Sequence, residues 1–395
     1  MQSTASTPIF TVQFWLLGLS SFLFSSSFNM LIPELPSHLT AMGGEEYKGL
    51  IIGLFTLTAG LSRPFSGRLT DTIGRVPVMI FGSLVCVICG FLYPVFLTVV
   101  PFLLLRLTHG FSTGFKPTGT SAYVADIVPA NRRGEALGIH GICMGMGSAF
   151  GPAVGSSIRN IFSLNVLFYF SSFLALLSIL ILLNMKETLV SKQPFSWNSL
   201  KITWRDIFEP TVFKPALITF LVYFGFGTVL TVTPDLSTHL NLENRGIYFM
   251  IFTVFSLLVR LLAGKISDRK GREPVTVFGC LFLIIAMFCT GFAQTVLFFS
   301  LGAAFFGIAM GILSPVLSAW TVDLSGDHNR GRALATMYIT LEAGIGLGAV
   351  LSAAIFDNQF DNISLVFNTI AGIAFLALAY ALYLYINKRK ESRVI

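Results

Sequence analysis

Two charged residues of opposite sign, Lys116 and Glu342, lie inside long apolar runs of this sequence. Lys116 is ten residues from Asp126, and Glu342 is ten residues from Arg332, the charged residues that bound the two runs. At about 1.5 Å per helical residue, ten residues span about 15 Å, half of a ~30 Å hydrocarbon layer. A charge at that depth is costly, so such residues commonly bind a substrate or carry a proton.

Equal depth and opposite charge predict that Lys116 and Glu342 pair with each other. We expect Glu342 to take up a proton when the pair separates, which would make it a proton-coupling residue. An ion pair that only holds the structure together is the alternative.

Arg106 lies about 30 Å from Asp126 by the same arithmetic, near the other boundary of its run. Further candidates for the proton or substrate site are therefore Arg106 and two carboxylates that follow prolines, Glu34 and Asp235.

A charged stretch at residues 67–75 returns at residues 264–272 with a constant offset of 197. The alignment continues without a gap as far as Gly151 and Gly348, which indicates an internal duplication. Asp71 and Arg75 are four residues apart, so one helical turn presents both, and Asp126 could also reach Arg75. Gly67 is expected to allow close packing of helix ends. The predicted gating residues are Gly67, Asp71, Gly74, Arg75, Asp126, Asp268, Arg272 and Asp323. Charges that only fix the topology are the alternative.

The elements that must position these residues are membrane-spanning helices. Hydrophobic residues make up 54% of the chain, charged residues make up 11%, and the mean hydropathy is +0.77. Runs of about 20 apolar residues can cross a bilayer, and only helices satisfy the backbone there. The sequence predicts an all-α membrane protein with twelve spans, near 10–33, 49–67, 77–97, 101–127, 134–160, 164–185, 212–236, 246–264, 274–293, 296–321, 333–356 and 363–387.

The duplication predicts two pseudo-symmetric six-helix bundles, at residues 1–185 and 212–395, joined by a cytoplasmic linker at 186–211. Most lysines and arginines fall in alternate loops and in the basic tail, so both termini are expected to be cytoplasmic. The outer side then holds only Lys48, Arg159 and Arg245. Arg63 and Arg260 lie at the inner ends of spans and are expected to extend to the lipid surface.

The fifth predicted span is rich in glycines spaced four residues apart, which bring helix backbones together, and Pro152 should bend it. We expect a tight, kinked helix where the two halves meet. The second copy has Ala349 in place of Pro152, so the kink is asymmetric. The residues of this motif are Gly147, Gly151, Pro152 and Gly155.

Several of these stretches resemble motifs of the major facilitator superfamily, and together they cover nearly the whole chain. Residues 67–75 resemble its signature loop, and residues 106–114 resemble a second motif. Residues 147–155 resemble the motif of its proton-driven antiporters, and residues 31–36 resemble the end of the first span in its twelve-helix drug/proton antiporter branch.

The resemblance implies alternating access, in which the signature-loop charges stabilise the outward-open state. It also implies a coupling carboxylate in the first half, where this chain has none at depth apart from Glu34 at an outer end. Spans that line the cavity in this fold carry five further candidates for substrate contact: Asn29, Tyr123, Tyr223, Trp320 and Tyr338.

The favoured function is proton-coupled export of a small organic or amphipathic compound by a monomeric multi-pass protein of a cell membrane, such as a bacterial inner membrane. The alternatives are an uptake symporter in which Lys116 and Arg106 bind an anionic metabolite, and a non-transporting receptor. No nucleophile–base pair, phosphate loop or metal cluster suggests an enzyme, and no basic aromatic face suggests nucleic acid. The proton gradient replaces a cofactor, and the partners are protons, lipid and a small molecule.

Overall fold

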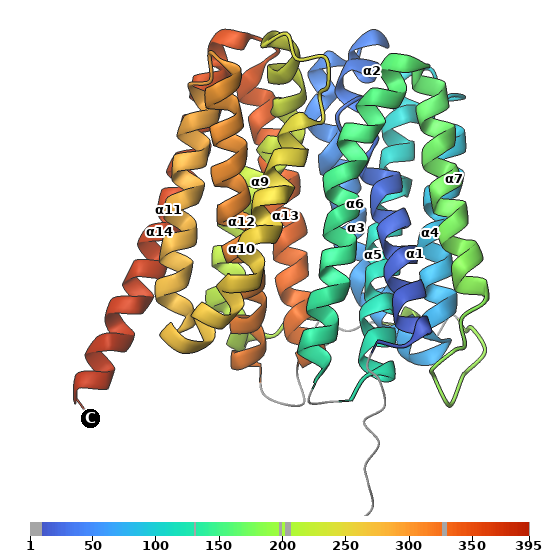
Figure 1. The fold of residues 1–395 in the computed structure, drawn as a ribbon, viewed down its shortest axis with the longest axis vertical. Helices are drawn as coiled ribbons and strands as arrows, with labels where there is room; N and C mark the ends of the chain where they lie inside the picture. Colours follow the sequence, from blue (N-terminus) through green and yellow to red (C-terminus); the bar gives the residue numbers. More distant parts are fainter. Residues whose placement is uncertain (1–9, 130–131, 197–199, 202–206, 326–329, 395) are drawn as a thin grey trace, which may run out of the picture.

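The computed structural model describes residues 10–129, 132–196, 200–201, 207–325 and 330–394. Twelve helices of 18 residues or more run side by side in this part of the chain (Figure 1). They are α1 (Val12–Asn29), α3 (Lys48–Thr72), α4 (Arg75–Leu92), α5 (Val99–Ile127), α6 (Arg133–Ile161), α7 (Leu164–Leu183), α9 (Phe213–His239), α10 (Ile247–Lys270), α11 (Arg272–Gly291), α12 (Val296–Leu324), α13 (Arg330–Phe356) and α14 (Ile363–Val394). Short helices α2 (Leu35–Ala41), η1 (Glu45–Tyr47), η4 (Pro210–Val212) and η5 (Phe360–Asn362) lie between them.

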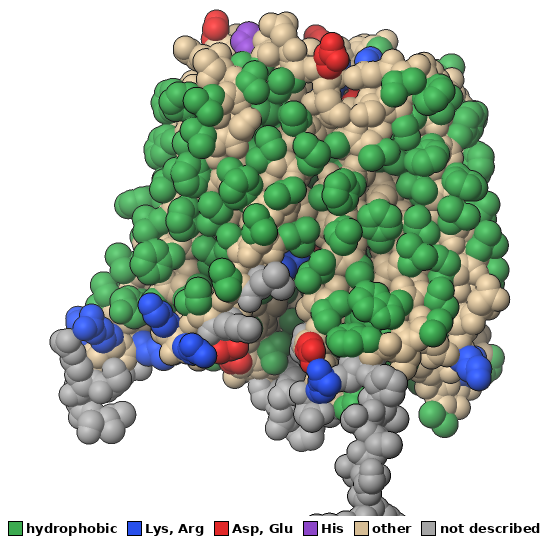
Figure 2. Space-filling view, in the orientation of Figure 1, with side chains coloured by type: hydrophobic (Ala, Val, Ile, Leu, Met, Phe, Trp, Pro, Cys, Tyr) green, Lys and Arg blue, Asp and Glu red, His purple; other side chains and the backbone are tan. Residues whose placement is uncertain are grey.

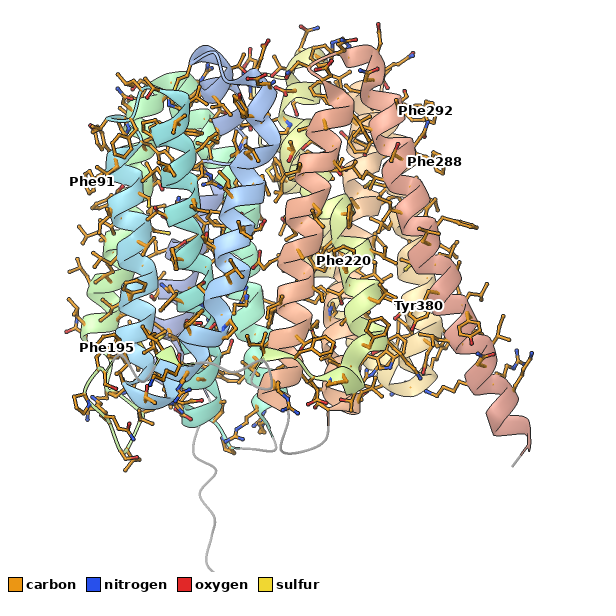
Figure 3. All side chains as sticks on the ribbon, turned by 180° about the vertical axis from the view of Figure 1, so that it is seen from behind. Phe91, Phe195, Phe220, Phe288, Phe292 and Tyr380 are labelled. Carbon is orange, nitrogen blue, oxygen red and sulfur yellow. The ribbon has the colours of Figure 1, made fainter. Side chains whose placement is uncertain are left out.

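The surface of the helix bundle suits a lipid environment. Apolar side chains cover its flanks, and charged side chains gather at its two ends (Figure 2). Phe91, Phe288 and Phe292 point outward from the flanks (Figure 3) and are 44–54% exposed. Because water would make so much exposed apolar surface unfavourable, this surface belongs in a bilayer.

Among the described residues, eight helices are long and apolar enough to cross a membrane, or nine if the bent helix α10 counts as one span. Helix α10 bends by 43° directly after Arg260. Helices α1, α3 and α5 are less apolar because they carry serines or charged residues, most of which face the interior. The twelve predicted spans thus correspond to twelve long helices, of which eight or nine qualify by composition.

The helices form two bundles, α1 to α7 and α9 to α14, that meet mainly where α3 packs on α13 and α6 packs on α10 (Figure 1). The internal repeat is visible in the packing. A Cβ at Gly110 would meet the carbonyl oxygen of Phe55, and one at Gly307 would meet that of Phe252, both pairs being related by the offset of 197. The expected two-bundle fold is confirmed.

The two ends of the bundle differ in charge. We call the end that holds Arg75, Arg272 and Lys388 the basic end, and the end that holds Glu34 and Asp235 the opposite end. At the basic end, Gly74 and Gly271 have φ angles of +126° and +92°. This left-handed backbone favours glycine and lets α4 follow α3 after two residues and α11 follow α10 after one.

One expectation about glycines needs correction. A Cβ at Gly67 would meet nothing within 4 Å, so this residue does not mediate close helix packing. Gly147, Gly151 and Gly155 approach a backbone closely, as expected; it is that of α1 in the same bundle, with carbonyl oxygens 2.2–3.0 Å from the built Cβ positions. Helix α6 also meets the other bundle at α10, and among the motif residues Pro152 lies against Gly246 there.

Candidate functional site

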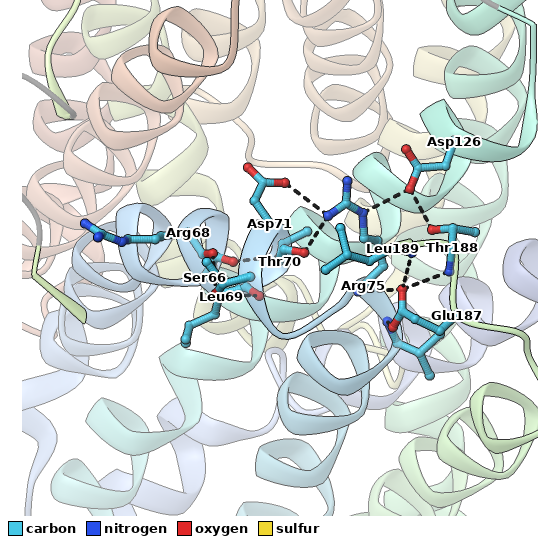
Figure 4. A network of polar contacts seen from close by, with 12 residues as sticks. Ser66, Arg68, Leu69, Thr70, Asp71, Arg75, Asp126, Glu187, Thr188 and Leu189 are labelled. Carbon is cyan, nitrogen blue, oxygen red and sulfur yellow. Dashed lines mark hydrogen bonds and ion pairs between the residues drawn. The ribbon is translucent and has the colours of Figure 1, made fainter. Parts of the chain in front are cut away.

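The signature residues form a charge cluster at the basic end (Figure 4). Arg75 Nε donates to Asp126 Oδ2 at 3.0 Å, and Arg75 lies 3.2 Å from Asp71. The second bundle repeats the arrangement, with Arg272 at 2.8 Å from Asp323 and 2.6 Å from Asp268. The structure therefore brings together the predicted charged residues, each set within its own bundle. Their role in gating stays a prediction.

A carboxylate that the sequence motifs did not indicate, Glu187, completes the first cluster. Glu187 accepts hydrogen bonds from the backbone N–H groups of Arg75 and Val76, both at 3.1 Å, and so caps the start of α4. Thr188 beside it donates to Asp126 at 2.6 Å. The chain just after α7 therefore helps to hold this cluster in place.

The cluster supports a comparison of two variants. Asp126 is 30% exposed and has two partners, whereas Asp71 is 73% exposed and contacts only Arg75 among the described residues. We expect Asp126→Asn to slow transport several-fold more than Asp71→Asn does, because exposed ion pairs contribute little. Initial transport rates at matched protein levels test this. Equal rates for the two variants would show that the Arg75–Asp126 contact has no special role.

At the opposite end, two ion pairs connect the bundles. Glu34 lies 3.1 Å from Arg245, and Asp235 lies 2.8 Å from Lys48. Lys48 and Arg245 are repeat mates by the offset of 197, and Glu34 and Asp235 occupy the similar Pro-Glu-Leu and Pro-Asp-Leu sequences. Each bundle thus gives its carboxylate to the other bundle's cation. We call these the reciprocal pairs. The sequence did not predict that Lys48 and Arg245 would be the partners of these carboxylates, although the offset of 197 relates the two cations.

Further contacts close the opposite end. Asn244 Nδ2 donates to the carbonyl oxygen of Ala153 at 3.0 Å, and Asn160 Nδ2 donates to that of Glu243 at 2.8 Å. A Cβ at Gly49 would lie 2.8 Å from that of Ala353. At the basic end, by contrast, the ion pairs found among the described residues stay within one half of the chain. The structure is therefore closed at the opposite end.

Midway between the ends, one ion pair joins the bundles. Arg63 on α3 donates to Glu342 on α13 at 2.9 Å, and the Arg63 guanidinium lies 4.5 Å from the centre of the Tyr338 ring. The Glu342 and Arg63 side chains are 9% and 12% exposed. Arg63 is nine residues from the end of α3, about 14 Å at the usual helical rise, so it stays inside rather than reaching the lipid surface.

The expected pair of Lys116 with Glu342 is wrong. Lys116 Nζ instead donates to the backbone and hydroxyl oxygens of Ser20, both at 3.0 Å, and to the hydroxyl of Ser178. Its ammonium also lies 4.7 Å from the centre of the Phe24 ring. These partners belong to α1 and α7, so Lys116 points into its own bundle. Lys116 and Glu342 lie at the same depth, but Lys116 is on a face of α5 that points away from Glu342.

We expect Lys116→Ala to act on stability and leave proton coupling intact. The change empties a fully packed position and removes the donor of three hydrogen bonds. Truncation of a large buried side chain typically costs about 2–5 kcal/mol. A lower thermal midpoint with an unchanged response to the pH gradient, per folded molecule, is the expected result. If Lys116→Ala instead abolished proton coupling and left the thermal midpoint of unfolding unchanged, Lys116 would have to be part of the transport site.

Arg106 is also enclosed within the first bundle. Its side chain donates to the carbonyl oxygen of Ile51 at 3.0 Å and to the Tyr93 hydroxyl at 3.1 Å, and it lies over the Phe55 ring. The residue is only 2% exposed. Arg106 and Lys116 are therefore corrected from candidate substrate ligands to interior residues of one bundle.

Of the five other substrate candidates, Tyr338 and Tyr223 lie near the Arg63–Glu342 pair, and the other three lie elsewhere. Tyr338 lies beside the Arg63–Glu342 pair. Tyr123 donates to the carbonyl oxygen of Lys186, near the basic end. Asn29 donates to Ser25 and Ser148. Tyr223 on α9 has its hydroxyl near Ser314 and within electrostatic range of Tyr338, Glu342 and Arg260. Trp320 belongs to the apolar core of the second bundle.

Comparison with known proteins agrees with this geometry. The Major Facilitator Superfamily matches residues 15–293 and 216–395. A "Multi-drug resistance efflux pump PmrA" of Streptococcus pneumoniae is 26% identical over 374 residues, covering 91% of this chain and 92% of that protein. "Multidrug resistance protein 2" of Bacillus subtilis is 25% identical over 346 residues, with 83% and 84% covered.

Solved structures show the same fold. The D-xylose-proton symporter has a TM-score of 0.78, with 93% of this chain and 96% of that chain covered. The human organic anion transporter MFSD10 (TETRAN) has a TM-score of 0.72, with 93% and 98% covered, and both are 18% identical to this chain. The two-bundle membrane fold and the family match together indicate a membrane transporter and not an enzyme. The chain belongs to the Major Facilitator Superfamily.

Proposed function

We propose that this transporter exports a small organic or amphipathic compound in exchange for protons, by alternating access. The observation that carries the proposal is the Arg63–Glu342 pair, a carboxylate and a cation from opposite bundles that meet halfway along the helices. The relatives named multidrug resistance proteins and efflux pumps support the export direction.

The pair supplies a physical reason for coupling. When the bundles separate at this depth, Glu342 loses Arg63, and an unpaired carboxylate at membrane depth is costly. Uptake of a proton removes that cost, and loss of the proton allows the pair to form again. The conformational change and the protonation of Glu342 are thereby linked.

For the orientation, we propose that the basic end faces the cytoplasm, as the distribution of lysine and arginine favours. The present structure is then closed to the outside by the reciprocal pairs. We further propose that the protein acts as a monomer in a cell membrane, such as a bacterial inner membrane, with both termini cytoplasmic and with halves at residues 1–185 and 212–395.

The alternative of proton-coupled uptake of an anionic metabolite depended on Lys116 and Arg106 as ligands. Both are enclosed within one bundle and bound to neutral oxygens. These two residues therefore give no support to uptake, and the relatives named efflux pumps and multidrug resistance proteins favour export.

Transport in proteoliposomes tests the proposal. A compound panel is first screened by counterflow without a gradient, which identifies substrates regardless of direction. Each substrate is then followed with an imposed pH gradient of either sign. Exchange predicts accumulation in the compartment of lower pH, because protons leaving it drive the compound in. Accumulation in the compartment of higher pH would identify symport, and indifference to the gradient would exclude proton coupling.

A further inference from the structure

Arg260 is the repeat mate of Arg63, but its surroundings differ. It lies on α10, ten residues from the end of that helix, or about 15 Å at the usual rise. Its guanidinium donates to the Ser314 hydroxyl at 3.1 Å. Within the described part of the chain, no carboxylate lies within ion-pair distance of Arg260. This positive charge at membrane depth thus has a neutral hydroxyl as its hydrogen-bond partner, with Tyr223 of α9 nearby.

The repeat explains what Arg260 lacks. Arg63 is flanked by the ring of Tyr338 and the carboxylate of Glu342, both from α13 of the other bundle. The positions that correspond to these two residues, 197 earlier in the chain, are Gly141 and Gly145 on α6. Where Arg63 has a ring and an acid, Arg260 has two residues without side chains.

The contacts confirm that these glycines take the corresponding places. A Cβ built on Gly141 has Arg260 Nη1 as its neighbour at 3.7 Å. A Cβ on Gly145 would lie 3.3 Å from Leu257, and one on Gly60, the mate of Leu257, would lie 3.3 Å from Glu342. Helices α6 and α10 therefore meet as α13 and α3 do.

Space is also available beside Arg260. A Cβ on Gly138, one turn closer to the basic end than Gly141, would meet nothing within 4 Å, and the only neighbour for Gly141 is Arg260 itself. By contrast, Gly147 and Gly151 farther along α6 are closely packed on α1. Of these four glycines, Gly138 and Gly141 are the two with free space beside them, and they lie toward the basic end, where no ion pair described above joins the bundles.

We propose that Arg260 and the glycine face of α6 form the substrate site, and that the substrate is an aromatic organic anion. Its acidic group replaces the carboxylate that Gly145 lacks, and its ring lies where Tyr338 lies against Arg63. A guanidinium binds a carboxylate through paired hydrogen bonds and packs on an aromatic face, so it recognises both parts. This inference rests on the proposed transport function and names the substrate class for it.

Equilibrium binding to the full-length protein, without any pH gradient, tests the inference. The probes are 2-naphthoate, its uncharged amide 2-naphthamide, and the cation 2-naphthylmethylammonium, which share the ring and differ in charge. We expect the wild-type protein to bind the naphthoate at least tenfold more tightly than the amide or the cation. Arg260→Gln should abolish this preference. Weaker or equal binding of the naphthoate by the wild-type protein would overturn the proposal.

A glycine variant with a matched control provides a second test. Gly145→Glu should supply Arg260 with an internal carboxylate and weaken naphthoate binding at least tenfold. Gly145→Gln has the same size without the charge and should weaken it less than threefold. Monodisperse elution of both variants on gel filtration checks that they fold. Equal losses would mean that bulk alone acts, which contradicts the proposed anion site.

These tests separate the substrate class from proton coupling. A clear preference for the naphthoate with no response of transport to a pH gradient would reject proton-coupled export and retain the site. A pH-driven transporter that binds all three probes equally would retain the function and reject the site.

Discussion

Glu342→Gln is expected to abolish accumulation of substrate against a gradient while exchange of substrate for substrate continues. Glutamine resembles the protonated carboxyl group permanently, so the bundles can separate without loss of an ion pair. Proton entry then no longer limits the conformational change. In proteoliposomes with an imposed pH gradient, we expect accumulation to fall at least tenfold, whereas counterflow without a gradient should stay within a few-fold of the wild-type rate.

A control variant removes the charge of a carboxylate that does not contact the other bundle. Glu135 pairs with Arg132 at 2.7 Å near the basic end, and both side chains are more than 40% exposed. Glu135→Gln makes the same chemical change without touching the contact between the bundles, and it should leave accumulation unchanged. Undiminished accumulation in Glu342→Gln would remove this residue from the coupling mechanism. Attention would then move to Glu34 and Asp235, the other carboxylates that join the bundles.

Disruption of the reciprocal pairs should open the opposite end. The combined change of Glu34→Gln and Asp235→Asn removes both carboxylates that hold cations of the other bundle at this end. A hydrogen bond to a charged group contributes about 1.5–3 kcal/mol, so the loss of two pairs amounts to several kcal/mol. Since about 1.4 kcal/mol corresponds to a tenfold change in population, we expect the open form to rise by tenfold or more.

Cysteine labelling measures this opening. Ser157 accepts a hydrogen bond from Asn244 of the other bundle, so a cysteine at position 157 is covered while the opposite end is closed. In a background without the five native cysteines, an impermeant maleimide added on that side should label Ser157→Cys at least tenfold faster in the double variant.

A charge exchange distinguishes pairing from a general effect of mutation. Lys48→Asp places two acids together and should open the opposite end, whereas Lys48→Asp combined with Asp235→Lys restores an ion pair of inverted polarity and should close it again. Equally fast labelling of the single and the exchanged variants would show that the Lys48–Asp235 contact does not hold the bundles together.

The helices, the duplication and the charge clusters of the basic end could all be predicted from the amino-acid sequence. Span length and hydropathy are local properties, because a helix in a bilayer must cover a fixed thickness with apolar residues. The Arg75–Asp126 contact was also predictable, since these residues end neighbouring spans at the same end. The offset of 197 then predicted the second cluster around Arg272.

Which of the charged residues at membrane depth form pairs could not be predicted, because it depends on how the helices pack. Sequence gives the depth of a residue along its helix, but the direction in which its side chain points depends on how that helix is rotated against its neighbours. Lys116 and Glu342 share a depth, yet Lys116 faces α1 and α7 within its own bundle. Arg63, which hydropathy alone placed at a lipid-exposed helix end, faces the other bundle and holds Glu342. The contrast between Tyr338 beside Arg63 and Gly141 beside Arg260 likewise became visible only once packing had fixed the facing surfaces, because rotation about a helix axis is set by side-chain packing between helices.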